Sequence, residues 1–218
     1  MRSGTQSLKL QTWFSDKSHV PTRITFRENA VSPNDFWYDW YGLNSWLFVL
    51  VNGSHPARLD GLMEGLSTLS HPSAFPLYIA IALVACHARP RACPPVNLVV
   101  FAVSYVLVSM LLVPGLKEAF DFPRPIEALG AGAVRVIGHP DPHHAFPSGH
   151  AAFAVLATAS LLPGAAPVTK VALILFALLA CVSRIWVGAH YPADVLGGAL
   201  IALATAAFTR AAIKRLAR

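Results

Sequence analysis

The sequence predicts an all-α, polytopic membrane helical bundle, with about five to six transmembrane helices and amphipathic interfacial helices near the N-terminus. Hydrophobic residues make up 55% of the chain and charged residues only 13%, whereas a soluble domain carries about 25% charged residues. Mean hydropathy is +0.51. Several apolar runs also approach the roughly 20 residues that a helix needs to cross a bilayer. These observations exclude an ordinary soluble domain.

The chain divides into a polar segment, residues 1–40, and a membrane domain, residues 41–218. The first segment lacks the apolar core and cleavage site of a signal peptide, and we expect it to be interfacial or partly disordered. The aromatic-rich run "NDFWYDWYGLNSWLFVLVN" then favours the headgroup zone. Its apolar part, Leu43 to Val51, is too short to span and predicts an interfacial helix. The stretch "ARLDGLMEGLSTLSH" has helical spacing and predicts a second amphipathic helix, at the surface or leading into the first span.

Five apolar segments follow, at residues 73–88, 96–116, 149–163, 170–188 and 194–211. The connectors "HARPRACPP" and "LPGAAPVTK" and the tail "TRAAIKRLAR" are basic or short, which predicts that they face the cytoplasm. By alternation, the long connector "KEAFDFPRPIEALGAGAVRVIGHPDPHHAFPSGH" faces the opposite, outer side, which would be the periplasm in a bacterial inner membrane. The net charge of +6 is explained by these loops, and no nucleic-acid partner is expected.

Two features of the chain outside the apolar segments need interpretation. Five spans with a cytoplasmic tail place the N-terminus outside, but the five basic residues within residues 1–40 favour the inside. A sixth crossing built from residues 42–70 is the alternative.

The three cysteines form no CxxC pair and two lie in apolar runs, so we expect inert side chains and no disulfide framework.

Three polar clusters fall on the same predicted face. They supply Lys117 and Arg124 from "KEAFDFPRP", Ser148, Gly149 and His150 from "FPSGH", and Arg184, His190 and Asp194 from "SRIWVGAHYPAD". Ser148 is a natural N-cap of a helix. Asp194, four residues after His190, is close enough to accept a hydrogen bond from the imidazole. Each residue alone has an ordinary structural explanation, such as a snorkelling cation or a helix cap. These explanations fail together, because every cluster lies at a span end on one face.

The combined chemistry of the clusters is suited to phosphate. Three cations and two helix N-termini favour an anion, and arginine forks match phosphate oxygens. His190, paired with Asp194, has the fixed tautomer and raised basicity of a nucleophile. His150 lies in position to pass a proton to the leaving oxygen and later to activate water.

The histidine-rich stretch "HPDPHH" (139–144) is an alternative site for a metal. Its candidate ligands are His139, Asp141, His143 and His144. Prolines interrupt the stretch, which favours a flexible loop at the rim of the site over a metal centre. The prediction is therefore that the protein has no metal and no cofactor.

The three motifs, in this order, resemble those of the type 2 phosphatidic acid phosphatase superfamily, which includes vanadium-dependent haloperoxidases. The resemblance covers roughly residues 43–210. It implies metal-independent hydrolysis through a phosphohistidine, with His190 as nucleophile, Asp194 as its partner and His150 as acid and base. It also implies that the phosphate is held by Lys117, Arg124, Ser148, Gly149 and Arg184. Among members, the chain looks most similar to bacterial undecaprenyl-diphosphate phosphatases.

The motifs leave several functions open. The first is hydrolysis of a lipid phosphate, with undecaprenyl diphosphate as the favoured substrate and membrane lipids as surroundings. Lipid A and phosphatidylglycerophosphate phosphatases fit nearly as well, and a lipid-to-lipid phosphotransferase would use the same phosphohistidine. A lipid-binding or transport protein is the non-enzymatic alternative. A haloperoxidase fits poorly, because a site at the edge of a leaflet suits a lipid headgroup better than vanadate. The motifs define no oligomeric state.

Overall fold

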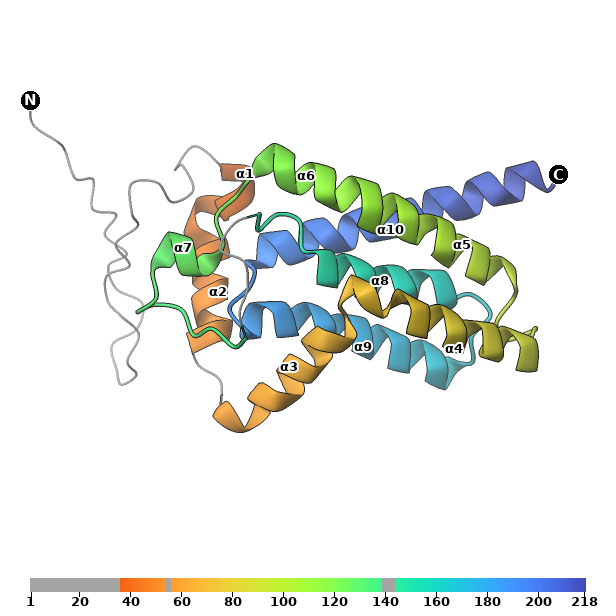
Figure 1. The fold of residues 1–218 in the computed structure, drawn as a ribbon, viewed down its shortest axis with the longest axis horizontal. Helices are drawn as coiled ribbons and strands as arrows, with labels where there is room; N and C mark the ends of the chain where they lie inside the picture. The colour runs from red at the N-terminus through yellow and green to blue at the C-terminus, as the bar shows by residue number, and fades with distance from the viewer. Residues whose placement is uncertain (1–35, 54–55, 139–143) are drawn as a thin grey trace, which may run out of the picture.

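The computed structural model describes residues 36–53, 56–138 and 144–218, and within these ranges all regular structure is helical. The helices are α1 (Phe36–Asp39), α2 (Leu43–Gly53), α3 (Asp60–Leu69), α4 (Phe75–Ala88), α5 (Val96–Tyr105), α6 (Val113–Phe120), α7 (Pro125–Leu129), α8 (Gly149–Leu161), α9 (Pro167–Trp186) and α10 (Pro192–Leu216). Figure 1 shows α4, α5, α8, α9 and α10 running along one another, with α1, α2 and α7 gathered at one end. The prediction of an interfacial or partly disordered polar segment falls mostly on residues 1–35, which lie outside the described residues.

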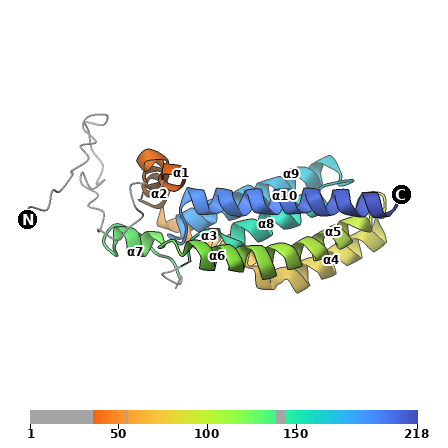
Figure 2. The same ribbon diagram turned by 90° about the horizontal axis from the view of Figure 1, so that it is seen from above.

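Helix α8 is the centre of the bundle. It packs against α10, α9 and α5, and the view from above also shows it among these helices (Figure 2). Its sequence is rich in alanine, and such small side chains let neighbouring helices approach closely in membranes. Phe153 and Leu156 of α8 are fully buried beside Phe101 of α5. The hydrophobic core therefore lies between α8 and its neighbours.

Helices α5 and α6 form one long rod, because a π-helical segment, Val106–Leu112, joins them without a break. Pro114 explains this segment, since proline lacks the N–H that would continue the α-helical ladder to the preceding turn. The rod from Val96 is long and apolar enough to cross a membrane, as are α9 and α10. Helices α3 and α4 pass the same test together but are bent by 63° at a short break.

The five predicted apolar segments correspond to α4, the α5–α6 rod, α8, α9 and α10. The described residues contain three helices of spanning length, or four if the bent pair is one span. Helix α8 has 13 residues, or roughly 20 Å of helix, and is shorter than a span. The chain is thus a multi-pass helical membrane protein in which one predicted span is a short central helix. The stretch "ARLDGLMEGLSTLSH" forms α3, and α3 leads into α4, which was the second of the two placements predicted for this amphipathic helix.

The prediction for the aromatic-rich run was wrong in one respect. The helix α2 forms, but Tyr38, interpreted as an aromatic of the headgroup zone, is only 1% exposed. It packs with Phe48 of α2 and Val195 of α10 in a second core at the end of the bundle. Asn44 of α2 accepts a hydrogen bond from the backbone N–H of Ala193 (2.9 Å). The N-terminal helices therefore attach to the start of α10.

The expectation of three unpaired cysteines was also wrong. Cys86 and Cys93 form a disulfide, and Cys181 is free. The reason is local: the chain turns after α4, and the N–H of Cys93 donates to the carbonyl of Arg89 (2.9 Å). This turn returns the chain to the last turn of α4, with the two Cα atoms 4.6 Å apart, inside the usual range for a disulfide. A seven-residue separation carries no such signal in sequence.

Candidate active site

Three helix ends meet where α8 begins, α9 ends and α10 begins (Figure 1). Ser148 caps α8, as predicted, by accepting a bond from the N–H of Ala151 (3.5 Å). The N–H of Ser148 donates to the carbonyl of Asp194 (3.0 Å), which joins the start of α8 to the first turn of α10. The N–H of His190 donates to the carbonyl of Arg184 (3.2 Å) and folds the α9–α10 connection back. Backbone bonds thus hold the second and third motifs together.

The close approach of these motifs depends on Gly197 and Gly198 of α10. A Cβ atom at Gly198 would overlap the carbonyl oxygen of Ser148, and one at Gly197 would overlap the ring of Phe146. Because a helical glycine costs about 1 kcal/mol relative to alanine, the pair is explained by the space that the "FPSGH" loop needs. The loop can therefore lie directly on α10.

His190 and Asp194 form the buried pair that the spacing predicted. His190 Nδ1 lies 3.3 Å from Asp194 Oδ2, and both side chains are almost fully buried. Asp194 Oδ2 also accepts from the N–H of Tyr191 (2.9 Å), and Oδ1 accepts from the hydroxyl of Tyr38 (2.6 Å). The pKa of Tyr38 is raised well above 10, first by burial and then by the nearby Asp194. The phenol therefore keeps its proton and donates it.

The cations surround this pair. Arg184 is 6% exposed and Arg124 is 8% exposed. Burial lowers the pKa of His190 well below 6.5, and the charges of Arg184, Arg124, Lys117 and then His150 lower it further. The prediction of raised basicity was therefore wrong, because burial and the surrounding cations outweigh the pairing with Asp194. These groups are thus close enough to act on one imidazole. Lys117, from α6, donates to the carbonyl of His144 (2.8 Å), which fixes the stem of the long connector beside the site.

Arg184 has a buried donor that no described residue satisfies. One of its terminal nitrogens donates to the hydroxyl of Ser67 on α3. Its Nε is buried and has no hydrogen-bond partner among the described residues. A buried donor without a partner is costly, and an anion placed among these cations would satisfy it. This unsatisfied donor is what a bound anion near Arg184 would explain.

His150, in the first turn of α8, lies beside His71, a residue that the sequence reasoning missed. The two ring centroids are 4.9 Å apart and the ring planes are inclined at 77°. His71 occupies the break between α3 and α4. No sequence pattern near His71 identifies it as a site residue, because His150, the side chain that it contacts, is 79 positions later in the chain.

The structure gathers every predicted site residue at one end of the bundle. They are Lys117 and Arg124, Ser148, Gly149 and His150, and Arg184, His190 and Asp194. The site also includes Tyr38, Ser67 and His71, which the motifs did not reveal. Tyr38 could have been noticed only as one aromatic among several, and Ser67 as one serine of an amphipathic helix.

Only one of the four candidate ligands of the metal alternative, His144, lies among the described residues. His144 lies 3.0 Å from Asp121 and contacts the carbonyl of Lys117. His139, Asp141 and His143 fall outside the described residues. Among residues 36–53, 56–138 and 144–218, no group of three or more His, Cys, Asp or Glu side chains is arranged to hold a metal ion.

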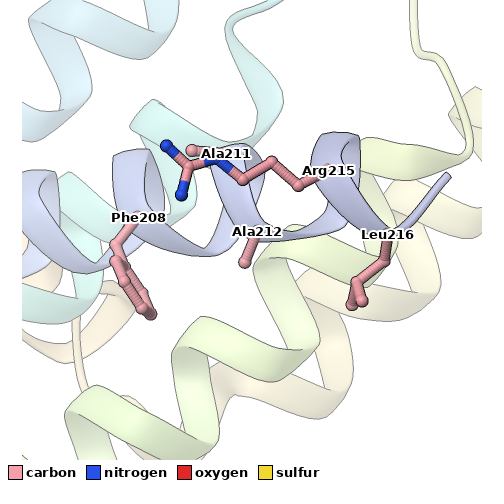
Figure 3. A pocket seen from close by; sticks show the side chains of 5 residues that line it. All are labelled: Phe208, Ala211, Ala212, Arg215 and Leu216. Carbon is pink, nitrogen blue, oxygen red and sulfur yellow. The ribbon is translucent and has the colours of Figure 1, made fainter. Parts of the chain in front are cut away.

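A groove of about 550 Å³ lies elsewhere, on the last turns of α10. Figure 3 shows its lining, which is Phe208, Ala211, Ala212, Arg215 and Leu216. This lining is mostly apolar and belongs to the C-terminal end of α10, whereas the cation cluster surrounds the start of the same helix. The groove is therefore separate from the candidate active site.

Comparison with known proteins identifies the family and the fold. The family model described as PAP2 superfamily matches residues 97–218. An undecaprenyl-diphosphatase of Sulfolobus acidocaldarius is 30% identical over 163 residues, covering 73% of each chain. Among solved structures, LpxE of Aquifex aeolicus superposes with a TM-score of 0.66 at 28% identity, covering 77% of this chain and 94% of that one. A PAP2-type phosphatidylglycerolphosphate phosphatase of Bacillus subtilis shares the fold, with a TM-score of 0.62 at 22% identity over 80% and 86% of the two chains.

Proposed function

This chain belongs to the PAP2 superfamily of membrane lipid phosphatases, and from that premise we propose that it hydrolyses a lipid diphosphate through a phosphohistidine formed on His190. One observation carries the proposal. The buried His190–Asp194 pair lies among Arg184, Arg124 and Lys117, with His150 close by. The groups that the proposed mechanism needs as nucleophile, anion cradle and proton donor thus lie together, which supports the proposal.

In the first step, Nε2 of His190 attacks the terminal phosphorus. Nδ1 faces Asp194, so the proton resides on Nδ1 and the lone pair on Nε2. The N–P bond forms as the bond from phosphorus to the leaving oxygen breaks. Burial and the charges of nearby groups, Arg184 first, lower the pKa of His150 to about 2, so the negative charge of the bound substrate has to raise this pKa before His150 is protonated. The protonated His150 then donates its proton to that oxygen, and the cations stabilise the charge that accumulates on the phosphoryl oxygens.

In the second step, water attacks the phosphorus of the phosphohistidine. His150, now unprotonated, takes one proton from the water, and the N–P bond breaks to release inorganic phosphate. Asp194 stays hydrogen-bonded to His190 throughout and stabilises its positive charge in the intermediate. Neither step requires a metal ion, because Arg184, Arg124 and Lys117 supply the positive charge.

For the substrate, we favour undecaprenyl diphosphate, since the curated relative carries the name undecaprenyl-diphosphatase. Phosphatidylglycerophosphate and lipid A remain the rival substrates of the hydrolase. Transfer of the phosphoryl group to a second lipid is the rival reaction. A panel of these lipids with purified protein, scored both for free phosphate and for labelled lipid products, separates the candidates. Labelled lipid product in place of free phosphate would replace hydrolysis by transfer.

The test of the mechanism is His190→Ala, with His87→Ala as the matched control. His87 is exposed near the end of α4, away from the cluster. We expect His190→Ala to abolish phosphate release from every lipid, and His87→Ala to match the wild type. Turnover that survives in His190→Ala would overturn the nucleophile assignment. Activity should also survive EDTA; a loss restored by a divalent cation would support the metal alternative instead.

We further propose that the site faces the periplasm and that the C-terminal tail is cytoplasmic, because the basic connectors lie away from the cluster. Single cysteines at Ala131, in the exposed loop after α7, and at Arg218 test this in a cysteine-free background. A membrane-impermeant maleimide should label Ala131→Cys in intact cells and Arg218→Cys only after permeabilisation. The reverse pattern would invert the topology.

A further inference from the structure

We propose that His71 selects diphosphate over monophosphate substrates by donating a hydrogen bond to the phosphate that leaves with the lipid. This inference rests on the proposed function and deepens it. His71 lies outside the three motifs, at the break between α3 and α4. Its ring stands beside His150, with centroids 4.9 Å apart. His150 protonates the leaving oxygen, so His71 borders the leaving-group side of the site.

The break that carries His71 is held in place by hydrogen bonds from neighbouring helices. The hydroxyl of Tyr105 donates to the carbonyl of Pro72 (3.1 Å), and the hydroxyl of Tyr78 donates to the carbonyl of Leu69 (3.0 Å). Pro72 also lies against the start of α8, within 4.0 Å of the position of a Cβ on Gly149. The backbone of His71 is therefore fixed relative to His150, as a group that contacts substrate requires.

The hydrogen bonds of His71 define its tautomer. Its Nδ1 accepts from the backbone N–H of Ser73 (3.1 Å) and contacts the Ser73 hydroxyl (2.6 Å). A backbone N–H can only donate, so Nδ1 carries a lone pair and the proton of the neutral ring is on Nε2. The Nε2–H lies on the far side of the ring from Ser73. His71 thus offers a donor that its own turn does not use.

The chemistry of the leaving group determines what this donor recognises. When His190 attacks the terminal phosphorus of a diphosphate, the leaving group is a lipid monophosphate with charged non-bridging oxygens. When the substrate is a lipid monophosphate, the leaving group is an alcohol and offers no such oxygens. A donor beside His150 therefore stabilises only the first of these reactions, and a group that pairs with a required charge is a strong source of specificity.

The test compares kcat/KM of His71→Ala and His71→Gln on undecaprenyl diphosphate and undecaprenyl monophosphate. We expect His71→Ala to lose about tenfold or more on the diphosphate, the value of one hydrogen bond to a charged group, and less than about threefold on the monophosphate. Glutamine keeps an N–H donor and should recover part of the diphosphate rate. Ser73→Ala removes only the hydroxyl and should give a smaller loss.

The outcomes separate this inference from the function on which it rests. Equal losses on both lipids, or no loss on either, would overturn the role of His71 while leaving the hydrolase intact. Unfolding temperatures of the purified variants identify a loss that comes from misfolding, and the two-lipid ratio within one preparation is independent of the folded fraction. Failure of the proposed function is seen instead as activity in His190→Ala, or as a wild type that hydrolyses neither lipid.

Discussion

Removal of the Tyr38 hydroxyl tests whether the N-terminal helices take part in catalysis. In Tyr38→Phe the ring keeps its packing against Phe122 and Tyr191, and only the 2.6 Å bond to Asp194 is lost. The bond is buried and its acceptor is a carboxylate, so its loss costs roughly 1.5–3 kcal/mol. A free energy of 1.36 kcal/mol corresponds to about tenfold in rate. If the lost hydrogen bond acts only by orienting the His190–Asp194 pair for catalysis, kcat should therefore fall by about 10- to 150-fold.

The assay is phosphate release by purified protein, with kcat and KM measured separately and the unfolding temperature followed by tryptophan fluorescence. We expect kcat to fall with little change in KM, because Tyr38 contacts Asp194 rather than substrate. Tyr41→Phe is the matched control, since Tyr41 is 94% exposed. The reasoning is refuted if Tyr38→Phe has both the kcat and the unfolding temperature of the wild type. A lower unfolding temperature with unchanged kcat would restrict Tyr38 to a structural role.

Three further predictions follow from the fold and the site. Gly198→Ala should lower stability by roughly 1–3 kcal/mol and reduce activity, because the new Cβ would overlap the carbonyl oxygen of Ser148 at the α8 N-cap. Gly115→Ala is the control, since a Cβ there meets open space and the variant should unfold like the wild type. An unfolding temperature of Gly198→Ala equal to that of the wild type would contradict the prediction. The folded-state pKa of His190 is lowered, so the unfolded chain binds the extra proton below pH ~6.5. The unfolding temperature in phosphate-free buffer should therefore fall more steeply with acidification in the wild type than in His190→Gln, and parallel profiles would count against it. The Cys86–Cys93 disulfide conflicts with the proposed cytoplasmic α4–α5 connector, because cytosolic thiols are kept reduced. If the connector is cytoplasmic, the pair is reduced in cells and alkylation before denaturation should label both cysteines; a protected pair would place the connector in an oxidising compartment and overturn the proposed topology.

The sequence predicted the elements whose signal is local. Apolar runs gave the long helices because the membrane demands about 20 apolar residues of a spanning helix. Ser148 was identified as an N-cap and the His190–Asp194 pair as a contact because both depend on spacings of three or four residues within one helix start. The meeting of the three motifs at one end also followed, since alternation of spans places their ends on one face.

Other features depend on contacts between distant parts of the chain and leave no local pattern. Tyr38 bonds Asp194 across 156 positions, and an aromatic side chain beside an apolar run looks the same in sequence whether it contacts headgroups or a buried carboxylate. The Cys86–Cys93 bond depends on how tightly the chain turns after α4. Helix α8 resembles a span in composition, but its length and burial are evident only when its neighbours are in place.

The position of α8 has a consequence for how the protein is made. This helix is emerging from the ribosome before α9 and α10, the two partners that cover much of its surface, have been synthesised. Until α9 and α10 have been synthesised, α8 can pack only against the earlier helices, such as α5. Because Asp194 lies in the first turn of α10, the proposed catalytic centre is incomplete until the start of this last helix has been synthesised. A chain that stops before α10 would lack both Asp194 and much of the packing around α8.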